Sequence, residues 1–122
     1  MNKEELKKIL KLHKAWINGE KDGIRADLRG ANLRGADLCG ADIDYSCLPL
    51  WCGSLQANMD DRQVKQLLYH VLSIVINSNN VSDDLKSILL TEKNLNVANE
   101  FHRVYECGKL IKVMEDDQED KQ

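Results

Sequence analysis

Hydrophobic residues between positions 26 and 43 recur every five residues. Four pentads follow in one frame, Ala-Asp-Leu-Arg-Gly, Ala-Asn-Leu-Arg-Gly, Ala-Asp-Leu-Cys-Gly and Ala-Asp-Ile-Asp-Tyr. Their central residues are Leu28, Leu33, Leu38 and Ile43. A period of five fits neither the 3.6 residues of an α-helix nor the 2 of a β-strand. The pattern predicts a coil that turns a corner after each pentad, with Leu and Ala inward and the polar residues facing water.

This repeat resembles the signature of the pentapeptide-repeat family, whose members form a right-handed quadrilateral β-helix with four pentads in each rung. After the fourth pentad the frame loosens. Leu48 keeps register with Leu28, Gly53 falls where a Leu would repeat, and Ala57-Asn58-Met59 is displaced by one residue. We therefore expect a β-helix of about two rungs over residues 22–60, with an irregular second rung. At roughly 4.8 Å per rung it is too short to stand without caps.

Helical spacing on both sides of the repeat predicts those caps. Asn2 followed by Glu5 resembles a capping box, and the apolar stripe behind it predicts a helix over residues 3–18, ending near Asn18-Gly19. The stripe contains His13, and a lone histidine there is usually a hydrogen-bonded core residue. The remaining faces carry lysines, which we expect to lie in water rather than on a membrane.

The C-terminal cap is expected to be helical over residues 61–108. A first helix, capped by Asp60, would run to Asn77, a second from 83 to 90, and a third from 91 to 106 or 107. The inward residues expected in the first helix are Val64, Leu67, Leu68, Val71, Leu72 and Val75. Those expected in the third are Leu95, Ala98, Phe101, Val104 and Tyr105.

The predicted fold class is therefore mixed β/α: a short quadrilateral β-helix capped by an N-terminal helix and a C-terminal helical region. We expect a single domain over residues 1–114, followed by an acidic, disordered tail at 115–122. The net charge of −3 arises in that tail, where residues 115–121 hold five acids and one base. The rest of the chain is close to neutral, so nucleic-acid binding through charge is not expected.

No apolar run approaches the roughly 20 residues of a membrane span, and no signal sequence is recognisable. We therefore expect a cytoplasmic protein whose cysteines are reduced or bind a metal. Two chemistries are open to these cysteines. Zinc could bind to Cys47, Cys52, His102 and Cys107, although this spacing is not that of a zinc knuckle. Cys52 could act as a nucleophile with His70 or His102 as its base, but no enzyme signature matches. The prediction is no catalytic residue, no cofactor and no metal.

The predicted binding surface lies where the five-residue period fails, at the junction of the coil with the helices. Trp51 interrupts a polar coil beside Pro49 and Leu50, and aromatic residues are favoured at interfaces. Trp51 could instead be a hydrophobic plug between the coil and the helices. The residues assigned to partner or ligand binding are Trp51, Cys52, Ser54, His70, His102 and Arg103. They would contact a host protein or, alternatively, a small anion such as a nucleotide signal.

The layout as a whole resembles short pentapeptide-repeat proteins encoded by phages and prophages of Gram-positive bacteria. The shared stretches are Trp16 to Glu20, Ser46 to Ser54, Tyr69-His70, Phe101 to Val104 and Cys107-Gly108. This resemblance implies no enzymatic activity. It points to a phage protein that inhibits a host protein or defence system, and two rungs are too short for the DNA mimicry of longer members. Apolar residues outside the main stripes further predict a homodimer through the helical regions.

Overall fold

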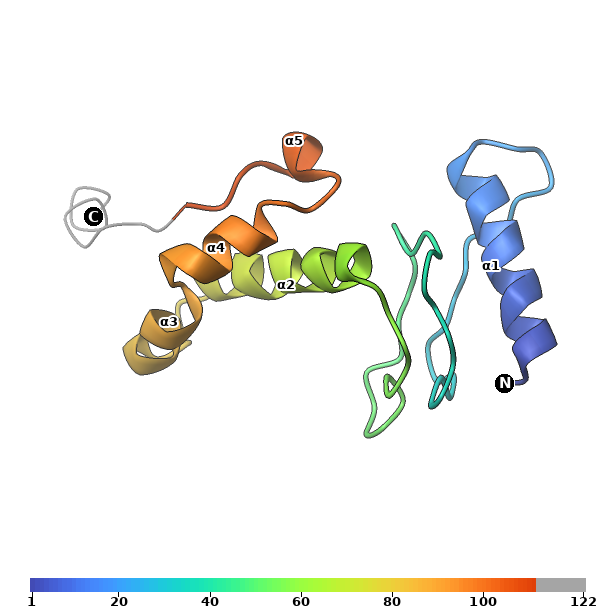
Figure 1. The fold of residues 1–122 in the computed structure, drawn as a ribbon, viewed down its shortest axis with the longest axis horizontal. Helices are drawn as coiled ribbons and strands as arrows, with labels where there is room; N and C mark the ends of the chain where they lie inside the picture. Colours follow the sequence, from blue (N-terminus) through green and yellow to red (C-terminus); the bar gives the residue numbers. More distant parts are fainter. Residues whose placement is uncertain (112–122) are drawn as a thin grey trace. The chain divides into compact units, whose positions relative to one another are not determined.

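The computed structural model describes residues 1–111, which contain the five helices labelled in Figure 1. The chain divides into two compact units, Met1–Asp60 and a second that begins at Asp61. The single domain expected over residues 1–114 stays a prediction. The predicted acidic tail lies outside the described residues.

The N-terminal helix α1 spans Lys3–Ile17, which confirms the predicted position and both of its ends. The Asn2 side chain accepts the backbone N–H of Glu5 at 2.8 Å, as a capping residue does. The helix ends at Asn18, followed by Gly19 at a φ of 73°. Leu6 is buried, and Ile9 and Leu10 pack with it against the coil. The apolar stripe therefore anchors α1 to the repeat.

His13 joins α1 to the start and the end of the four pentads. Its Nδ1 accepts the backbone N–H of Ala26 at 2.9 Å, so its Nε2 carries the proton and donates to the carbonyl of Asp44 at 2.7 Å. The side chain is fully buried. The prediction of a hydrogen-bonded core histidine is confirmed.

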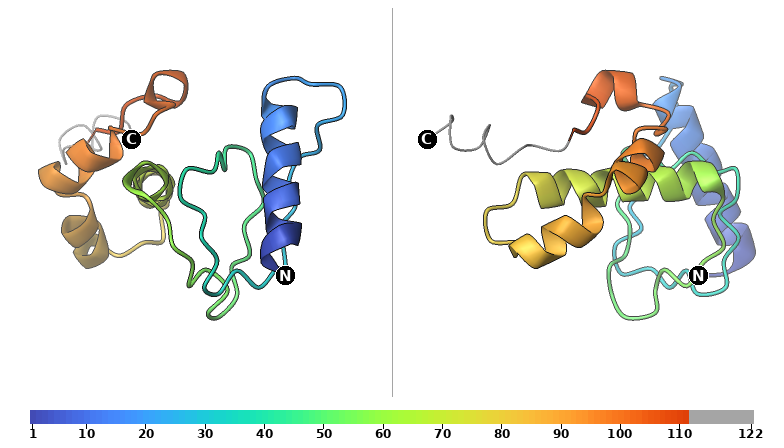
Figure 2. Two further views of the ribbon diagram at one scale, coloured as in Figure 1. Left: turned by 45° about the vertical axis from the view of Figure 1, so that its right-hand side comes forward. Right: turned by 60° about the vertical axis from the view of Figure 1, so that its left-hand side comes forward.

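The repeat forms an irregular coil over residues 24–59, called here the repeat coil. Leu28 and Leu38 are 0% exposed and Leu33 is 1% exposed, which confirms that the central pentad residues point inward. Figure 2 shows the backbone of this segment winding in open loops. Backbone hydrogen bonds join residues about twenty positions apart, such as Leu28 N–H to Cys47 O at 2.8 Å and Leu38 N–H to Asn58 O at 2.8 Å.

The predicted β-helix is wrong. Residues 1–111 contain no β-strand, and the only β-pairing among them is two isolated parallel bridges, Asp27 with Cys47 and Asp37 with Asn58. Each of the first three pentads ends in a turn that contains a glycine at a φ of 74° to 78°. Because a ladder needs consecutive extended residues, these turns leave too few of them to form one. The fold of the described chain is thus helices with an irregular coil.

The second unit contains α2 (Asp61–Ile76), α3 (Asp83–Leu89), α4 (Glu92–Ala98) and α5 (Val104–Cys107). Ser82 and Thr91 cap α3 and α4 through their hydroxyls, in agreement with the predicted helix starts. The core of this unit is formed by Tyr69, Leu72, Val75, Leu90, Leu95, Ala98 and Phe101. Of the residues expected inward in the third helix, Leu95, Ala98 and Phe101 are confirmed as buried.

The buried face of α2 is rotated from the predicted one. Val64 and Val71 were expected inside but are 53% and 49% exposed, whereas Tyr69 is 4% exposed. Tyr69 packs on the ring of Phe101 with centroids 4.8 Å apart, and its hydroxyl donates to Gly108 O at 2.5 Å. These two contacts pull the Tyr69 side of α2 inward, because an amphipathic tyrosine gains both burial and a hydrogen bond there.

The predicted third helix is wrong in its second half, because the chain leaves the helix after Ala98 and resumes helical geometry only at Val104. The Asn99 side chain binds the backbone of Leu110 in both directions, accepting its N–H at 2.7 Å and donating to its carbonyl at 2.9 Å. An asparagine that bonds the backbone in this way competes with helix continuation. Tyr105, expected inward, is fully exposed.

Candidate binding site

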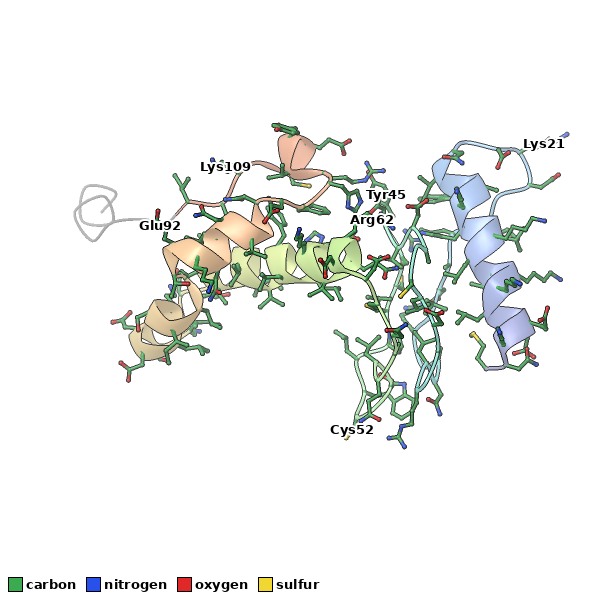
Figure 3. The ribbon with its side chains drawn as sticks, in the orientation of Figure 1. Lys21, Tyr45, Cys52, Arg62, Glu92 and Lys109 are labelled. Carbon is green, nitrogen blue, oxygen red and sulfur yellow. The ribbon has the colours of Figure 1, made fainter. Side chains whose placement is uncertain are left out.

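Residues 49–55 present apolar side chains to solvent where the chain bends at Trp51 into a turn at residues 52–55, and we call this segment the Leu50–Trp51 turn. Leu50 is 89% exposed and Trp51 is 47% exposed, although both are large and apolar. Figure 3 shows Cys52 at the outer end of one loop of the repeat coil. An exposed apolar pair at a loop tip costs hydration free energy and is a common mark of an interaction site.

Hydrogen bonds of the Ser54 side chain, which is 0% exposed, hold this turn in its conformation. The Ser54 hydroxyl lies 2.8 Å from Pro49 O and 2.7 Å from Trp51 O, and it accepts the backbone N–H of Trp51 at 3.3 Å. The sequence placed Ser54 in the binding set, but its hydroxyl is used inside the turn. Its role in the described structure is to fix the conformation that exposes its neighbours.

Trp51 is also fixed from its side chain. Its indole N–H donates to Ala31 O at 3.0 Å. The ring therefore lies against the start of the second pentad, while about half of the residue stays accessible to solvent. A tryptophan whose polar group is satisfied and whose face is open is suited to binding, because little side-chain entropy remains to be lost.

The guanidinium of Arg34 lies next to this turn, and a comparison of the first two pentads explains why no described acid pairs with it. In the first pentad Asp27 holds Arg29 in a two-pronged ion pair, with nitrogen–oxygen distances of 2.9 and 2.7 Å. In the second pentad Asn32 occupies the position of Asp27, and Arg34 forms no ion pair with any described residue. Its guanidinium instead packs over Gly53, where a Cβ would clash with it.

Two of the three predicted residues of the second unit lie against one aromatic ring. The His70 and His102 rings lie 5.4 and 5.0 Å from the ring of Phe101, centroid to centroid, and both histidines are exposed. Arg103 is half-buried and pairs with Glu106, with nitrogen–oxygen distances of 2.9 and 3.2 Å. The structure thus places both histidine rings against Phe101, while the charge of Arg103 is balanced by a neighbouring acid.

The six predicted site residues therefore form two groups, one in each unit. Trp51, Cys52 and Ser54 belong to the first unit; His70, His102 and Arg103 belong to the second. Whether the two groups make one surface stays a prediction.

For the alternative of zinc, no three His, Cys, Asp or Glu side chains gather into a possible metal site within residues 1–111. Cys52 and Cys107 are exposed and Cys47 is half-buried. For the thiol nucleophile, the one histidine of the first unit is His13, and both of its ring nitrogens are already hydrogen-bonded. The first unit thus supplies Cys52 with no imidazole base.

A second polar cluster, which the sequence did not indicate, surrounds Asp37. Its carboxylate accepts the backbone N–H of Cys39 at 3.1 Å and the amide of Asn58 at 3.2 Å. The hydrogen bonds from Cys39 hold the pKa of Asp37 below its ordinary value, and that carboxylate in turn raises the pKa of the Cys39 thiol. This cysteine is therefore kept protonated and less nucleophilic.

Sequence reasoning left Leu50 and Arg34 out of the binding set. The signal for Leu50 was its place between Pro49 and Trp51, and the signal for Arg34 was the change from Asp27 to Asn32 in an otherwise matching repeat. A comparison of each pentad with the one before it would have revealed Arg34, and attention to the apolar neighbours of Trp51 would have revealed Leu50.

Comparison with known families identifies the repeat. Residues 24–49 match the family model for pentapeptide repeats, in eight copies. This match supports the assignment of the segment to that family, while the resemblance to phage proteins stays a prediction. No curated protein and no solved structure matched the chain. No helix within residues 1–111 is long and apolar enough to cross a membrane.

Proposed function

We propose that this chain is a non-enzymatic protein-binding module that uses the Leu50–Trp51 turn as its anchor. The observation that supports the proposal is the combination of exposure and rigidity: Leu50 is 89% exposed in a turn whose serine hydroxyl is fully buried. Binding energy at protein interfaces is concentrated in a few apolar and arginine side chains, and rigid anchors lose less entropy on binding.

The partner surface that fits this turn is an apolar pocket with carboxylates on its rim. The pocket would receive Leu50 and the open face of Trp51. The carboxylates would meet Arg34, whose charge is not paired with an acid among the described residues. A charged rim around an apolar centre steers association and gives specificity.

The biological setting is part of the proposal. We propose a phage-derived protein that acts in the host cytoplasm, where it inhibits a host protein or defence system by covering a functional surface. This step is supported by the sequence resemblance to short phage and prophage proteins and by the absence of any enzyme signature.

A small anion is a second candidate ligand, at the His70–His102 pair. The exposed imidazole rings of His70 and His102 both lie against the buried ring of Phe101, and exposed rings of this kind can stack on the base of a nucleotide. Stabilisation by nucleotides that is lost in His70→Ala and kept in Trp51→Ala would favour this function over protein binding.

The docking turn is tested by site-specific photo-cross-linking in a bacterial host. A cross-linking amino acid at position 50 should capture a defined protein, whereas the same group at position 24 should not. Ile24 is a matched control because it is 61% exposed in the same unit. Equal capture at the two positions would contradict the proposal.

The captured protein is then purified and titrated with the variants. Leu50→Ser should weaken binding at least tenfold, and Ile24→Ser should change it less than twofold. Leu50 is so exposed that its replacement leaves the fold intact, which a melting curve verifies. Unchanged binding by Leu50→Ser would refute the turn as the anchor, and unchanged activity of the partner in the complex would refute the inhibition.

A further inference from the structure

A cavity of about 490 Å³ lies in the first unit, between the first turns of α1 and residues 32–37 of the repeat coil. Its volume is within the range of small-molecule sites, roughly 300–1,000 Å³. Of the residues discussed for protein docking, Arg34 alone lines the cavity, and none of them forms its apolar wall. The cavity therefore offers a second kind of surface, which shares one cation with the docking turn.

The wall of this cavity is aliphatic. Leu6 and Leu10 contribute from α1, and Leu33 and Ala36 from the repeat coil. Leu6 and Leu33 are 7% and 1% exposed, so they form a fixed floor. No aromatic side chain among the described residues lines the cavity, so these residues offer no stacking surface for a nucleobase or another flat ring.

The mouth of the cavity has a positive charge. Lys3 and Lys7, one helical turn apart on α1, line it together with Asp37. Neither lysine is in an ion pair with a described residue, and Lys3 lies close enough to Asp37 to lower the pKa of that carboxyl. The Asp37 carboxylate also accepts hydrogen bonds from the backbone N–H of Cys39 and the side-chain amide of Asn58. Lys7 and Arg34, which also lines the cavity, therefore remain as cations without an ion pair among the described residues, and Lys7 is the one that α1 contributes.

We propose that this cavity binds an aliphatic organic anion, with an unbranched alkyl chain along Leu6, Leu10 and Leu33 and a carboxylate or phosphate group at Lys7. Burial of an alkyl chain contributes about 0.8 kcal/mol per CH₂ group, and a charge-assisted hydrogen bond to the ammonium fixes the head group. A free lipid-like anion fits better than a membrane surface, because the apolar face of α1 is turned toward the repeat coil.

The proposal is tested with decyl phosphate and decanoate, both below the concentrations at which they form micelles, by titration calorimetry on the full chain. Each should bind with one site per chain. Inorganic phosphate and decanol, which carry only the head or only the chain, should bind at least tenfold more weakly. Amide NMR shifts should centre on Leu6, Leu10 and Ala36.

Two pairs of matched variants locate the site. Lys7→Glu should weaken binding of decyl phosphate at least fivefold. Lys8→Glu, the same charge change at an exposed neighbour outside the cavity, should weaken it less than twofold. Ala36→Leu should abolish binding by filling the cavity. Ala31→Leu, at the same repeat position one pentad earlier and outside the cavity, should retain it.

Absence of binding by the wild-type chain would overturn the proposal. So would equal losses in Lys7→Glu and Lys8→Glu, since these indicate unspecific attraction to α1. Adsorption to phosphatidylglycerol vesicles without binding of the free anions would assign the lysines to a membrane surface instead. A mononucleotide that binds more tightly than decyl phosphate would show that the aliphatic wall does not select the ligand.

Discussion

A single side-chain change between neighbouring repeats gives two arginines different roles. Arg29 and Arg34 occupy equivalent positions, but only Arg29 faces a carboxylate. Asn32 keeps the hydrogen bond that Asp27 makes to the backbone two residues later, at 3.0 Å against 3.1 Å. The substitution thus preserves the turn and removes only the charge, so that Arg34 is available to a partner.

The first prediction concerns the Asp27–Arg29 pair. The hydrogen bond from the Arg29 side chain is the main cause that lowers the pKa of Asp27 to about 2, from an ordinary 3.8. Because the folded-state pKa is below the unfolded one, the pair stabilises the fold above about pH 4, and this contribution is lost as the pH falls toward 2. A carbon-detected NMR titration should show this low pKa, and Arg29→Gln should raise it. An unchanged pKa in Arg29→Gln would contradict this assignment.

The second prediction concerns the Cys39 thiol. Asp37→Asn removes the carboxylate that raises the pKa of this thiol, so Cys39 should be alkylated several-fold faster at pH 8. The rate is measured by mass spectrometry of iodoacetamide-treated protein. Asp27→Asn is the control, since Asp27 holds Arg29 and should leave the rate at Cys39 unchanged. Equal rates in wild type and Asp37→Asn would argue against the electrostatic cause.

At the scale of elements, the contact between α1 and the start of the repeat coil depends on a glycine. The chain returns along α1 after Asn18, and Ile24 N–H donates to Leu12 O at 3.0 Å. A Cβ at Gly23 would clash with the backbone N and Cα of Trp16. No flexible side-chain end could move aside there, so helix and coil must separate to admit even one methyl group.

The third prediction follows from this contact. Gly23→Ala should cost about 3 kcal/mol of unfolding free energy, the upper end for overpacking. Gly30→Ala should cost about 1–2 kcal/mol, because Gly30 has a φ of 74° but open space around it. Urea denaturation of the two variants measures the difference. A larger loss in Gly30→Ala would show that α1 can shift away from the coil.

The fourth prediction concerns the break between α4 and α5. Asn99→Ala should destabilise the second unit by about 1–3 kcal/mol, because it leaves two backbone groups of Leu110 without their partner. The Leu110 amide should lose its protection from hydrogen exchange. Asn96→Ala, a change at an exposed residue within α4, should have almost no effect. Equal exchange at Leu110 in the two variants would contradict this role of Asn99.

Local signals in the sequence predicted the elements that depend on neighbouring residues. The capping residues Asn2, Ser82 and Thr91 indicated three helix starts, and the five-residue period indicated the buried Leu28, Leu33 and Leu38. Contacts between distant residues were not predictable in this way. The bonds from Asn99 to Leu110 and from Tyr69 to Gly108 join separate segments, so the helix break and the rotation of α2 lay beyond any local pattern.

The same distinction applies to the predicted site. The broken period directed attention to residues 49–54, because a segment that departs from the repeat can form a turn of its own. It did not reveal that the Ser54 hydroxyl bonds to backbone carbonyls within the turn. Those bonds depend on how the backbone folds back around the hydroxyl, which the repeat pattern does not show. The repeat pattern also predicted strands that are absent from residues 1–111, because it gives the direction of side chains but not the length of each extended segment.

At the scale of the whole molecule, the two units carry different kinds of surface. The first has the Leu50–Trp51 turn and the aliphatic cavity, whereas the second has an exposed apolar stripe on α2. Val64, Val71 and Ile74 are 53%, 49% and 63% exposed, and Leu67 lies between them. Their 3-4-3 spacing is that of two heptads, the pattern by which one helix packs against another.

We therefore predict a homodimer in which the α2 stripe of one copy packs against that of another. Two identical apolar stripes bury each other in a two-fold arrangement, the commonest symmetry of protein dimers. Light scattering should give twice the chain mass of 13.9 kDa. Ile74→Lys should yield a monomer, because it places two charges in the contact. Tyr105→Lys, at a fully exposed residue of α5, should remain dimeric. A wild-type monomer at submillimolar concentration, or a dimer that survives Ile74→Lys, would exclude α2 as the interface.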